Sequence, residues 1–270
     1  MSKIAFIGGG NMASCIIGGM LANGFEAAQI FVGNPGQEKR DSLQQRYGIA
    51  TSVDNHSAVA GAEIVVLAVK PQVMGAVAED LAHSIAADAL IVSVAAGIQL
   101  ADLQRWLGAQ RPIVRAMPNT PSMVRSGAAG LFANEFVSDQ QKQSIEAIFS
   151  AVGICCWVET EALIDAVIAV SGSGPAYFFL IMETMQRIGQ ELGLPEQTAR
   201  DLTIQTALGA AQMASTSELD AAQLRQQVTS PGGTTAAAIA TFQALDIEQN
   251  FRQAMQAAVD RAREMAKITN

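Results

Sequence analysis

The sequence is poor in aromatic and basic residues, and this shortage excludes one class of partner. Aromatic residues make up 5% of the 270-residue chain, and 17 Lys and Arg stand against 25 Asp and Glu, so the formal net charge is −8. The basic residues are scattered rather than clustered. Nucleic-acid binding needs a concentrated positive surface, usually with aromatic stacking platforms. We therefore expect no nucleic-acid partner.

Cysteine and histidine are also scarce. The three cysteines are Cys15, Cys155 and Cys156. An odd number with two neighbours argues against a disulfide framework and for a reducing compartment. Adjacent strand residues point to opposite faces, so Cys155 and Cys156 are unsuited to joint coordination, and we expect no metal.

Long uninterrupted apolar runs are missing too. The most apolar long stretch, residues 162–182, contains Asp165, Ser/Gly pairs and Pro175, and we interpret it as too interrupted for a membrane span. No signal peptide is visible, because Met1-Ser2-Lys3 leads directly into the strand of the predicted dinucleotide site. We expect a soluble, cytoplasmic protein without a membrane partner. Apolar residues still make up 50% of the chain, enough for a substantial core and a subunit interface.

The feature around which the chain is organised is the segment KIAFIGGGNMA at residues 3–13. It predicts a buried strand, a glycine turn and a helix that begins near Asn11. Gly8 allows the tight turn, Gly10 lets a pyrophosphate approach the backbone, and Ala13 lets the helix lie close to the strand. The phosphates would meet free N–H groups at the helix N-terminus. We predict a dinucleotide site here, against the alternative of a plain strand-turn-helix.

The end of the second predicted strand bears on the choice of dinucleotide. An acidic residue at this position usually grips the 2′-hydroxyl of NAD, whereas this chain has the neutral Asn34, followed by Lys39 and Arg40. This combination permits a 2′-phosphate, so we favour NADPH, with NADH as the alternative. The other interpretation is that Asn34-Pro35-Gly36 is only a turn and that Lys39 and Arg40 lie on a solvated helix face.

Strands and helices alternate as far as Val158, and helical periodicity follows from Glu161 onward. We predict an α/β fold with a Rossmann-like, doubly wound sheet in residues 1–158 and an all-helical domain in residues 159–270. The predicted strands are 4–7, 29–33, 48–51, 62–69, 90–94, 111–115, 127–133 and 153–158. The predicted helices of the second domain are 162–169, 175–192, 195–215, 221–227, 235–245 and 247–268.

Two loops of the helical domain are candidates for chemistry. SGSGPAY at residues 171–177 is predicted to join two helices, and TSPGGTT at residues 229–235 opens another. Consecutive amides at Gly232-Gly233 and the hydroxyls of Thr234 and Thr235 suit a small carboxylate at a positive helix end. The alternative interpretation is an ordinary capped helix start.

Together these motifs resemble one enzyme family. The glycine turn with Asn11-Met12, AVKP at 68–71, VSVAAG at 92–97, RAMPNTP at 115–121, VSGSGPAY at 170–177 and SPGGTT at 230–235 look like pyrroline-5-carboxylate reductase, in order over essentially the whole chain. The resemblance implies an oxidoreductase that reduces 1-pyrroline-5-carboxylate to L-proline with NAD(P)H, the last step of proline biosynthesis. It also implies that the helical domain forms an intertwined homodimer, often assembled further.

The resemblance also implies roles for individual residues. The cofactor residues would be Gly8, Gly10, Asn11 and Met12 at the pyrophosphate, Asn34 and Asn55 at the adenosine, and Val69, Lys70, Ala95, Ala96 and Pro175 near the nicotinamide. The substrate residues would be Ser230, Gly232, Gly233, Thr234 and Thr235, with Glu218 as a supporting group. Thr235 would be the catalytic residue, placed to hydrogen-bond the ring nitrogen.

The general acid that a ketone reductase needs is hard to find in this sequence. His56 and His83 are the only histidines, and we interpret both as surface residues. We interpret Lys70 as a cofactor-side cation and Tyr177 as helix packing. A cyclic imine protonated by solvent accepts hydride without a strong enzymic acid, so the shortage favours an imine reductase.

Two alternatives remain open. An NADP-dependent β-hydroxyacid dehydrogenase shares the architecture, but its expected lysine is missing, since Lys267 is the only lysine after residue 158. A non-catalytic dinucleotide-binding regulator would bind cofactor without turnover.

Overall fold

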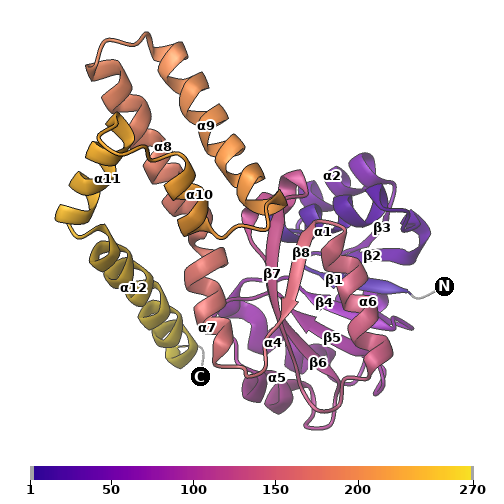
Figure 1. The fold of residues 1–270 in the computed structure, drawn as a ribbon. Coiled ribbons are helices and arrows are strands. Elements are labelled where there is room, and N and C mark those ends of the chain that lie inside the picture. The colour runs from indigo at the N-terminus through magenta and orange to yellow at the C-terminus, as the bar shows by residue number, and fades with distance from the viewer. Residues whose placement is uncertain (1–2, 269–270) are drawn as a thin grey trace. The chain divides into compact units, whose positions relative to one another are not determined.

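The computed structural model describes residues 3–268, with only the backbone of the last two. By contacts the described chain forms two units, drawn in Figure 1. One contains the residues up to Ser173 together with those from Ala258 onward, and the other is Gly174–Ala257. The predicted domain boundary at residue 158 lies next to the end of the last strand and stays a prediction.

The first unit is built on an eight-stranded sheet in the order β3-β2-β1-β4-β5-β6-β7-β8. All neighbouring strands are parallel except β6 and β7, which are antiparallel. From β1 the chain continues to β2 and β3 on one side, and it then crosses to β4 on the other side of β1. The end of β1 is therefore the topological switch point, where such sheets bind ligands. The strands are β1 Ile4–Ile7, β2 Ile30–Gly33, β3 Ala50–Ser52, β4 Ile64–Leu67, β5 Leu90–Ser93, β6 Ile113–Met117, β7 Gly127–Ala133 and β8 Gly153–Trp157.

Helices cover both faces of this sheet, because the period-two side chains of its central strands are apolar on both sides. Ile4 and Phe6 of β1 lie in the cluster that α1 and α6 complete, whereas Ala5 and Ile7 lie in the cluster of α4 and α5. The Rossmann-like prediction is confirmed. The helices and 3-10 turns are α1 Asn11–Ala22, η1 Ala27–Gln29, α2 Gln37–Tyr47, α3 Asn55–Val59, α4 Pro71–Leu81, α5 Leu100–Leu107, η2 Thr120–Val124 and α6 Asp139–Ser150.

The segment predicted as a loop at residues 171–177 is helical, and that prediction was wrong. α7 Leu163–Val167 passes into a π-helical turn, η3 Ile168–Gly172, and then into α8 Gly174–Glu191. Pro175 is tolerated because it lies in the first turn of α8, where a missing N–H breaks no bond. Leu163–Glu191 is thus one continuous helix, so the prediction that Pro175 and the Ser/Gly pairs interrupt it was wrong. By length and composition alone this helix is long and apolar enough to cross a membrane, and the prediction that it does not do so stays a prediction.

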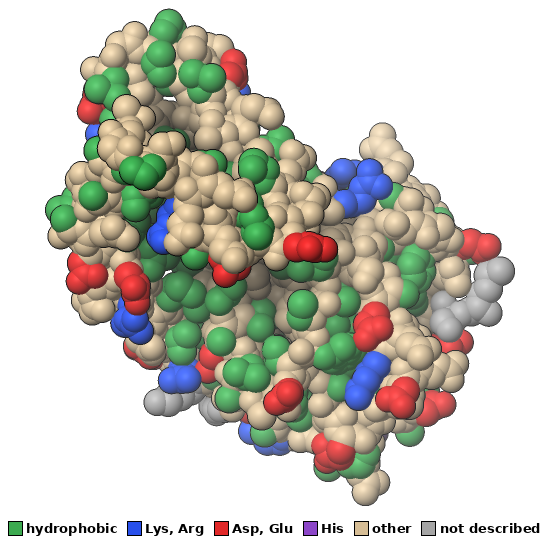
Figure 2. All heavy atoms as spheres, in the orientation of Figure 1, with side chains coloured by type: hydrophobic (Ala, Val, Ile, Leu, Met, Phe, Trp, Pro, Cys, Tyr) green, Lys and Arg blue, Asp and Glu red, His purple; other side chains and the backbone are tan. Residues whose placement is uncertain are grey.

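The second unit is helical and exposes much apolar surface. It contains α8, α9 Glu196–Thr216, α10 Ala221–Gln227, α11 Thr234–Ala244 and the first half of α12 Ile247–Ile268. α8 and α9 approach closely, since a Cβ on Gly189 would lie 3.3 Å from that of Ala199. Yet Phe178, Phe179 and Leu180 are each more than 60% exposed, and Figure 2 shows hydrophobic side chains across these helices. Such faces indicate an interface.

The end of α12 belongs to the first unit. Ala262 is buried in a small cluster with Ile164 and Ile168. Arg263 Nε lies 2.9 Å from Asp165 Oδ2, so an ion pair joins α12 to α7.

Candidate active site

The glycine turn after β1 has the backbone that the sequence pattern demands. Gly8 has φ +100°, a region that other residues rarely adopt, and a Cβ there would lie 2.6 Å from the carbonyl oxygen of Ala68. The Gly8 N–H donates to the carbonyl of Gly33 at 2.8 Å. Because β4 and β2 press on the turn from both sides, a side chain at residue 8 would have to displace backbone.

The next turn residue borders open space. Gly10 is the N-cap of α1, with φ −79° and ψ −176°, and no heavy atom lies within 4 Å of where its Cβ would be. No side chain caps this helix start, so the first-turn amides are available to a ligand. Within the first turn of α1, Asn11 is exposed, Met12 is half-buried and Ala13 is fully buried. The geometry suits an anion at this helix end.

Asn34 ties the glycine turn to the end of β2. Its side chain is 7% exposed; Oδ1 accepts from the Gly9 N–H at 3.0 Å, and Nδ2 donates to the Gly36 carbonyl at 3.0 Å. The sequence could not reveal this pair of bonds. The oxygen and the nitrogen of this side-chain amide are thus both hydrogen-bonded within the protein, so Asn34 fixes the shape of the predicted cofactor edge. Its own contact with the cofactor stays a prediction.

Arg40 holds a positive charge at the same strand end. Its Nη1 donates to the carbonyls of Asn34 and Pro35, both at 2.7 Å, and its side chain is half-buried. Lys39, next to it on α2, is exposed. No acidic side chain occupies residues 34–36. This corner of the described sheet therefore presents a guanidinium and a neutral amide where NAD-specific proteins present a carboxylate.

Asn55 begins α3, a short helix that the sequence analysis missed. Asp54 caps it by accepting from the N–H groups of His56 and Ser57. The Asn55 side chain lies against β2, since a Cβ on Gly33 would be 2.5 Å from Asn55 Oδ1. Among the described residues, two buried side-chain polar atoms lack a hydrogen-bond partner, Asn55 Oδ1 and Tyr177 Oη. Buried polar atoms are normally paired, so both are candidates for a ligand contact.

The residues predicted for the nicotinamide half follow β4 and β5. Strand register aligns Ile7 with Gly33 and Leu67, and Leu67 with Ser93, so the residues after these strands share one edge. Val69, Ala95 and Ala96 are half-buried there, while Lys70 is exposed at the N-cap of α4. The structure thus brings together the predicted cofactor residues of the first unit.

A close contact braces this edge from behind. Gly97 has φ +78°, and a Cβ there would lie 3.1 Å from the Cβ of Met265 on α12. The end of α12 therefore packs beside the loop that holds Ala95 and Ala96.

The predicted substrate residues lie in the second unit. α11 begins at Thr234 with Gly233 as N-cap and no side-chain cap, and Gly232 has φ +72°. The Gly233 N–H donates to the Ser230 carbonyl at 3.0 Å, which closes the turn. Ser230, Thr234 and Thr235 are exposed, so an uncapped helix start with adjacent hydroxyls faces outward. Glu218, in the turn between α9 and α10, is exposed, and Pro175 lies on the first turn of α8.

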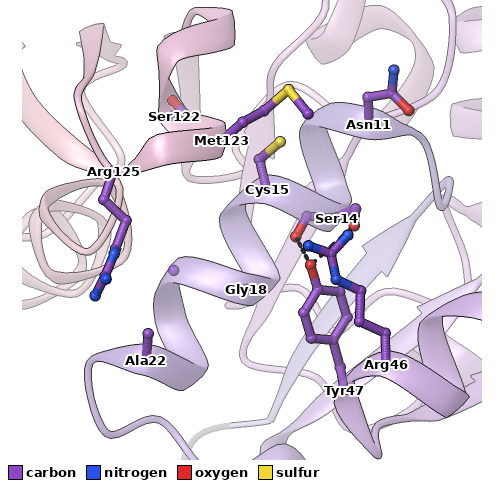
Figure 3. A pocket seen from close by; sticks show the side chains of 11 residues that line it. Asn11, Ser14, Cys15, Gly18, Ala22, Arg46, Tyr47, Ser122, Met123 and Arg125 are labelled. Carbon is purple, nitrogen blue, oxygen red and sulfur yellow. Dashed lines mark hydrogen bonds between the residues drawn. The ribbon is translucent and has the colours of Figure 1, made fainter.

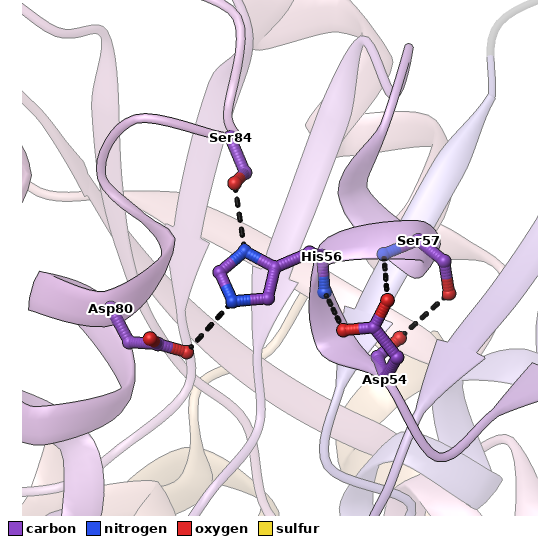
Figure 4. Close-up of polar contacts among 5 residues, drawn as sticks. All are labelled: Asp54, His56, Ser57, Asp80 and Ser84. Atoms are coloured by element: carbon purple, nitrogen blue, oxygen red, sulfur yellow. Dashed lines mark hydrogen bonds and ion pairs between the residues drawn. The ribbon is translucent and has the colours of Figure 1, made fainter.

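The histidines occupy the surface, as predicted. His56 Nε2 lies 3.1 Å from Asp80, and its Nδ1 lies 2.7 Å from Ser84 Oγ (Figure 4). His56 and His83 are both exposed. These contacts join the start of α3 to α4 and the turn after it.

A separate hollow lies along the outer face of α1. Its volume is about 330 Å³, and α1, the end of α2 and η2 line it (Figure 3). Tyr47 crosses to α1, with its hydroxyl donating to the Ser14 carbonyl at 3.0 Å, and only a glycine at 18 leaves room for it. Burial raises the pKa of the Cys15 thiol there, while Arg46 opposes the shift. Of the predicted cofactor residues, this hollow shares Asn11.

Comparisons with known proteins agree with this geometry. Residues 161–265 match the family model described as pyrroline-5-carboxylate reductase dimerisation, and residues 3–97 match the model described as NADP oxidoreductase, coenzyme F420-dependent. The chain is 54% identical to the pyrroline-5-carboxylate reductase of Pseudomonas aeruginosa, over 98% of this chain and 97% of that one. It is 45% identical to the Haemophilus influenzae enzyme of the same name, over 98% of each.

Solved structures give the same result. A pyrroline-5-carboxylate reductase from Coxiella burnetii superposes with a TM-score of 0.94 at 47% identity, over 98% of each chain. The Plasmodium falciparum pyrroline carboxylate reductase, solved with NADP bound, gives 0.87 at 27% identity over 98% of each chain. This chain therefore belongs to the pyrroline-5-carboxylate reductase family.

Proposed function

We propose that this chain reduces 1-pyrroline-5-carboxylate to L-proline with NADPH, the last step of proline biosynthesis. The observation that carries the proposal is the pairing of two uncapped helix starts, Gly10 before α1 and Gly233 before α11, with full-length family membership. The first suits a dinucleotide pyrophosphate and the second a small carboxylate.

The residues of the first unit fit a dinucleotide. The first-turn amides of α1 would hold the pyrophosphate, with Gly10 keeping the space in front of them clear. Asn55 Oδ1, buried without a partner, is an acceptor for a hydroxyl or amino group of the adenosine. Ala95 and Ala96 leave room for the nicotinamide ring beside the backbone. NADPH, when bound, supplies the hydride.

The preference for NADPH over NADH rests on charge at the end of β2. Arg40 is held there by two carbonyls and would attract a 2′-phosphate. An NAD-type carboxylate, which would repel that phosphate, is missing from residues 34–36. NADH lacks the phosphate, so it would gain less from this corner.

The second unit supplies the groups for an imine substrate. The amides at the start of α11, with Ser230 and Thr234, would hold the carboxylate, and the Thr235 hydroxyl would hydrogen-bond the ring nitrogen. Glu218 would support this loop. A ring nitrogen protonated by solvent makes the imine carbon electrophilic, so hydride would form the C–H bond while the π electrons of the C=N bond move onto nitrogen, which becomes the neutral ring amine. Orientation and exclusion of water are what the protein must then provide.

Assembly completes the proposal. We propose that residues 159–270 form the substrate-binding and dimerisation domain of a cytoplasmic homodimer, which higher assembly can extend. The exposed Phe178, Phe179 and Leu180 support it, because a second copy would remove this apolar surface from water.

The test is loss of reduced-nicotinamide absorbance when the purified chain meets NADPH and pyrroline-5-carboxylate, with proline quantified and NADH run in parallel. We expect rapid oxidation, one proline for each NADPH, and a higher kcat/KM with NADPH. Cofactor binding without oxidation would overturn the proposal; turnover of β-hydroxyacids with NADP would then indicate the related dehydrogenases, and no turnover a regulator.

A further inference from the structure

Asn119, in the RAMPNTP segment, is a buried amide whose two hydrogen bonds join separate elements. It follows β6 and is 7% exposed. Although Asn119 is the N-cap residue of η2, its side chain does not cap that turn. Oδ1 accepts from the Ala128 N–H of β7 at 2.9 Å, and Nδ2 donates to the Ser171 carbonyl at 3.0 Å.

The Ser171 carbonyl belongs to the π-helical turn η3. In this turn the Ser173 N–H reaches back five residues to the Ile168 carbonyl at 2.8 Å. Single π-turns of this kind are rare, they widen the helix locally, and they occur frequently at functional sites. The Asn119 amide therefore holds a carbonyl in the most irregular turn of the Leu163–Glu191 helix.

A second contact from the same segment meets the next residue of the turn. Met117 Cε lies against Gly172, since a Cβ there would be 2.8 Å from it. Met117 and Asn119 thus hold consecutive residues of the turn, and both come from the connection that leaves β6.

The chain then runs directly from this turn into Gly174 and Pro175. Pro175 is one of the residues predicted to lie near the nicotinamide, so the inference rests on the proposed function. We propose that Asn119 is a positioning residue, which fixes the π-turn and through it the start of α8 for hydride transfer. Its role is mechanical, and it needs no contact with substrate.

The chain offers a matched control. Asn134 is 5% exposed, and its amide makes the same pair of bonds at the opposite end of the β6–β7 pair, accepting from Ile113 N–H at 3.0 Å and donating to the Arg111 carbonyl at 2.8 Å. Asn119→Ala and Asn134→Ala each remove the two hydrogen bonds of a buried asparagine. They should lower the unfolding midpoint similarly, while only the first releases the π-turn.

The experiment compares both variants, in the full chain, by steady-state kinetics, NADPH binding and amide hydrogen exchange. For Asn119→Ala we expect kcat to fall about tenfold, which corresponds to the upper end of the free energy that one hydrogen bond contributes. The Kd for NADPH should stay within about threefold of wild type. Exchange at Ser173 and Gly174 should speed up by a similar factor. Asn134→Ala should leave kcat and these amides within about twofold of wild type.

Equal losses of kcat in the two variants, or unchanged exchange at Ser173 in Asn119→Ala, would overturn the inference. If Asn119→Ala does not fold, Asn119→Asp keeps the acceptor for the Ala128 N–H, removes the donor to the Ser171 carbonyl, and should give the same pattern. The exchange comparison needs no turnover. A wild-type chain that fails to reduce pyrroline-5-carboxylate would therefore refute the proposed function while the π-turn was still tested.

Discussion

Two glycines of the same turn should respond in opposite ways to the same substitution. In Gly8→Ala the new methyl group would lie 2.6 Å from the Ala68 carbonyl oxygen at φ +100°. In Gly10→Ala it would enter open space at φ −79°, which alanine adopts freely. The structure therefore assigns Gly8 to the fold and Gly10 to the ligand.

The magnitudes follow from these surroundings. A non-glycine residue in such a conformation costs about 1–3 kcal/mol, and the backbone clash adds to this, so Gly8→Ala should lower the free energy of unfolding by at least about 2 kcal/mol. Gly10→Ala should change it by less than about 1 kcal/mol, because alanine restricts the unfolded chain but is a poorer N-cap residue than glycine. Its methyl group would instead obstruct a phosphate contact worth about 1.5–3 kcal/mol, which raises the NADPH Kd about 10- to 100-fold.

The assay is urea unfolding of both variants without ligand, followed by calorimetric titration with NADPH. Two results would refute the assignment of Gly8 to the fold and Gly10 to the ligand. One is a Gly10→Ala variant that binds NADPH as tightly as wild type. The other is a Gly10→Ala variant as destabilised as Gly8→Ala.

Substitutions at Thr235, Arg40 and Glu161, two of them with a control variant, test the substrate loop, the cofactor corner and a buried ion pair. Thr235→Ala should lower kcat about 3- to 10-fold by removing one hydrogen bond, with Thr235→Ser retaining activity and NADPH binding unchanged; an unchanged kcat removes Thr235 from the mechanism. Arg40→Ala should raise the KM for NADPH about tenfold and leave that for NADH nearly unchanged, measured by parallel kinetics; equal changes would contradict a 2′-phosphate contact. Glu161→Gln breaks a pair in which Glu161 Oε1 lies 2.6 Å from the buried Arg115, and should cost about 1–3 kcal/mol in urea unfolding. Glu191→Gln, at the exposed pair with Arg187, should cost less than about 0.5 kcal/mol, and equal losses would be the contrary result.

The sheet was predictable because its signals are local. Each central strand is a short apolar run followed by glycine, proline or asparagine, and the alternation with helices specifies a doubly wound order. The strand β7 was predicted, but its antiparallel direction was not, since strand direction depends on contacts between distant residues. α3 was missed because five residues are too few to show a helical period, although the Asp54 cap gave a faint signal.

The candidate site divides in the same way. The positions of Gly8, Gly10 and Thr235 follow from spacing, because glycine turns and helix starts are written in adjacent residues. The side-chain amides of Asn34 and Asn119 make hydrogen bonds to residues 25 and 52 positions away along the chain, and no local sequence pattern indicates such contacts. The π-turn escaped prediction because Ser, Gly and Pro ordinarily mark a loop, and its bracing by Met117 and Asn119 overrides that tendency.

Isotope transfer tests directly whether the hydride of NADPH reaches the imine carbon of pyrroline-5-carboxylate. NADPH carrying deuterium at the transferred position is mixed with pyrroline-5-carboxylate and the enzyme, and the product is analysed by mass spectrometry and NMR. We expect proline with one deuterium at C5, formed in equal amount to the NADPH consumed. Proline without deuterium, or NADPH oxidised with no proline, would contradict hydride transfer to the imine carbon.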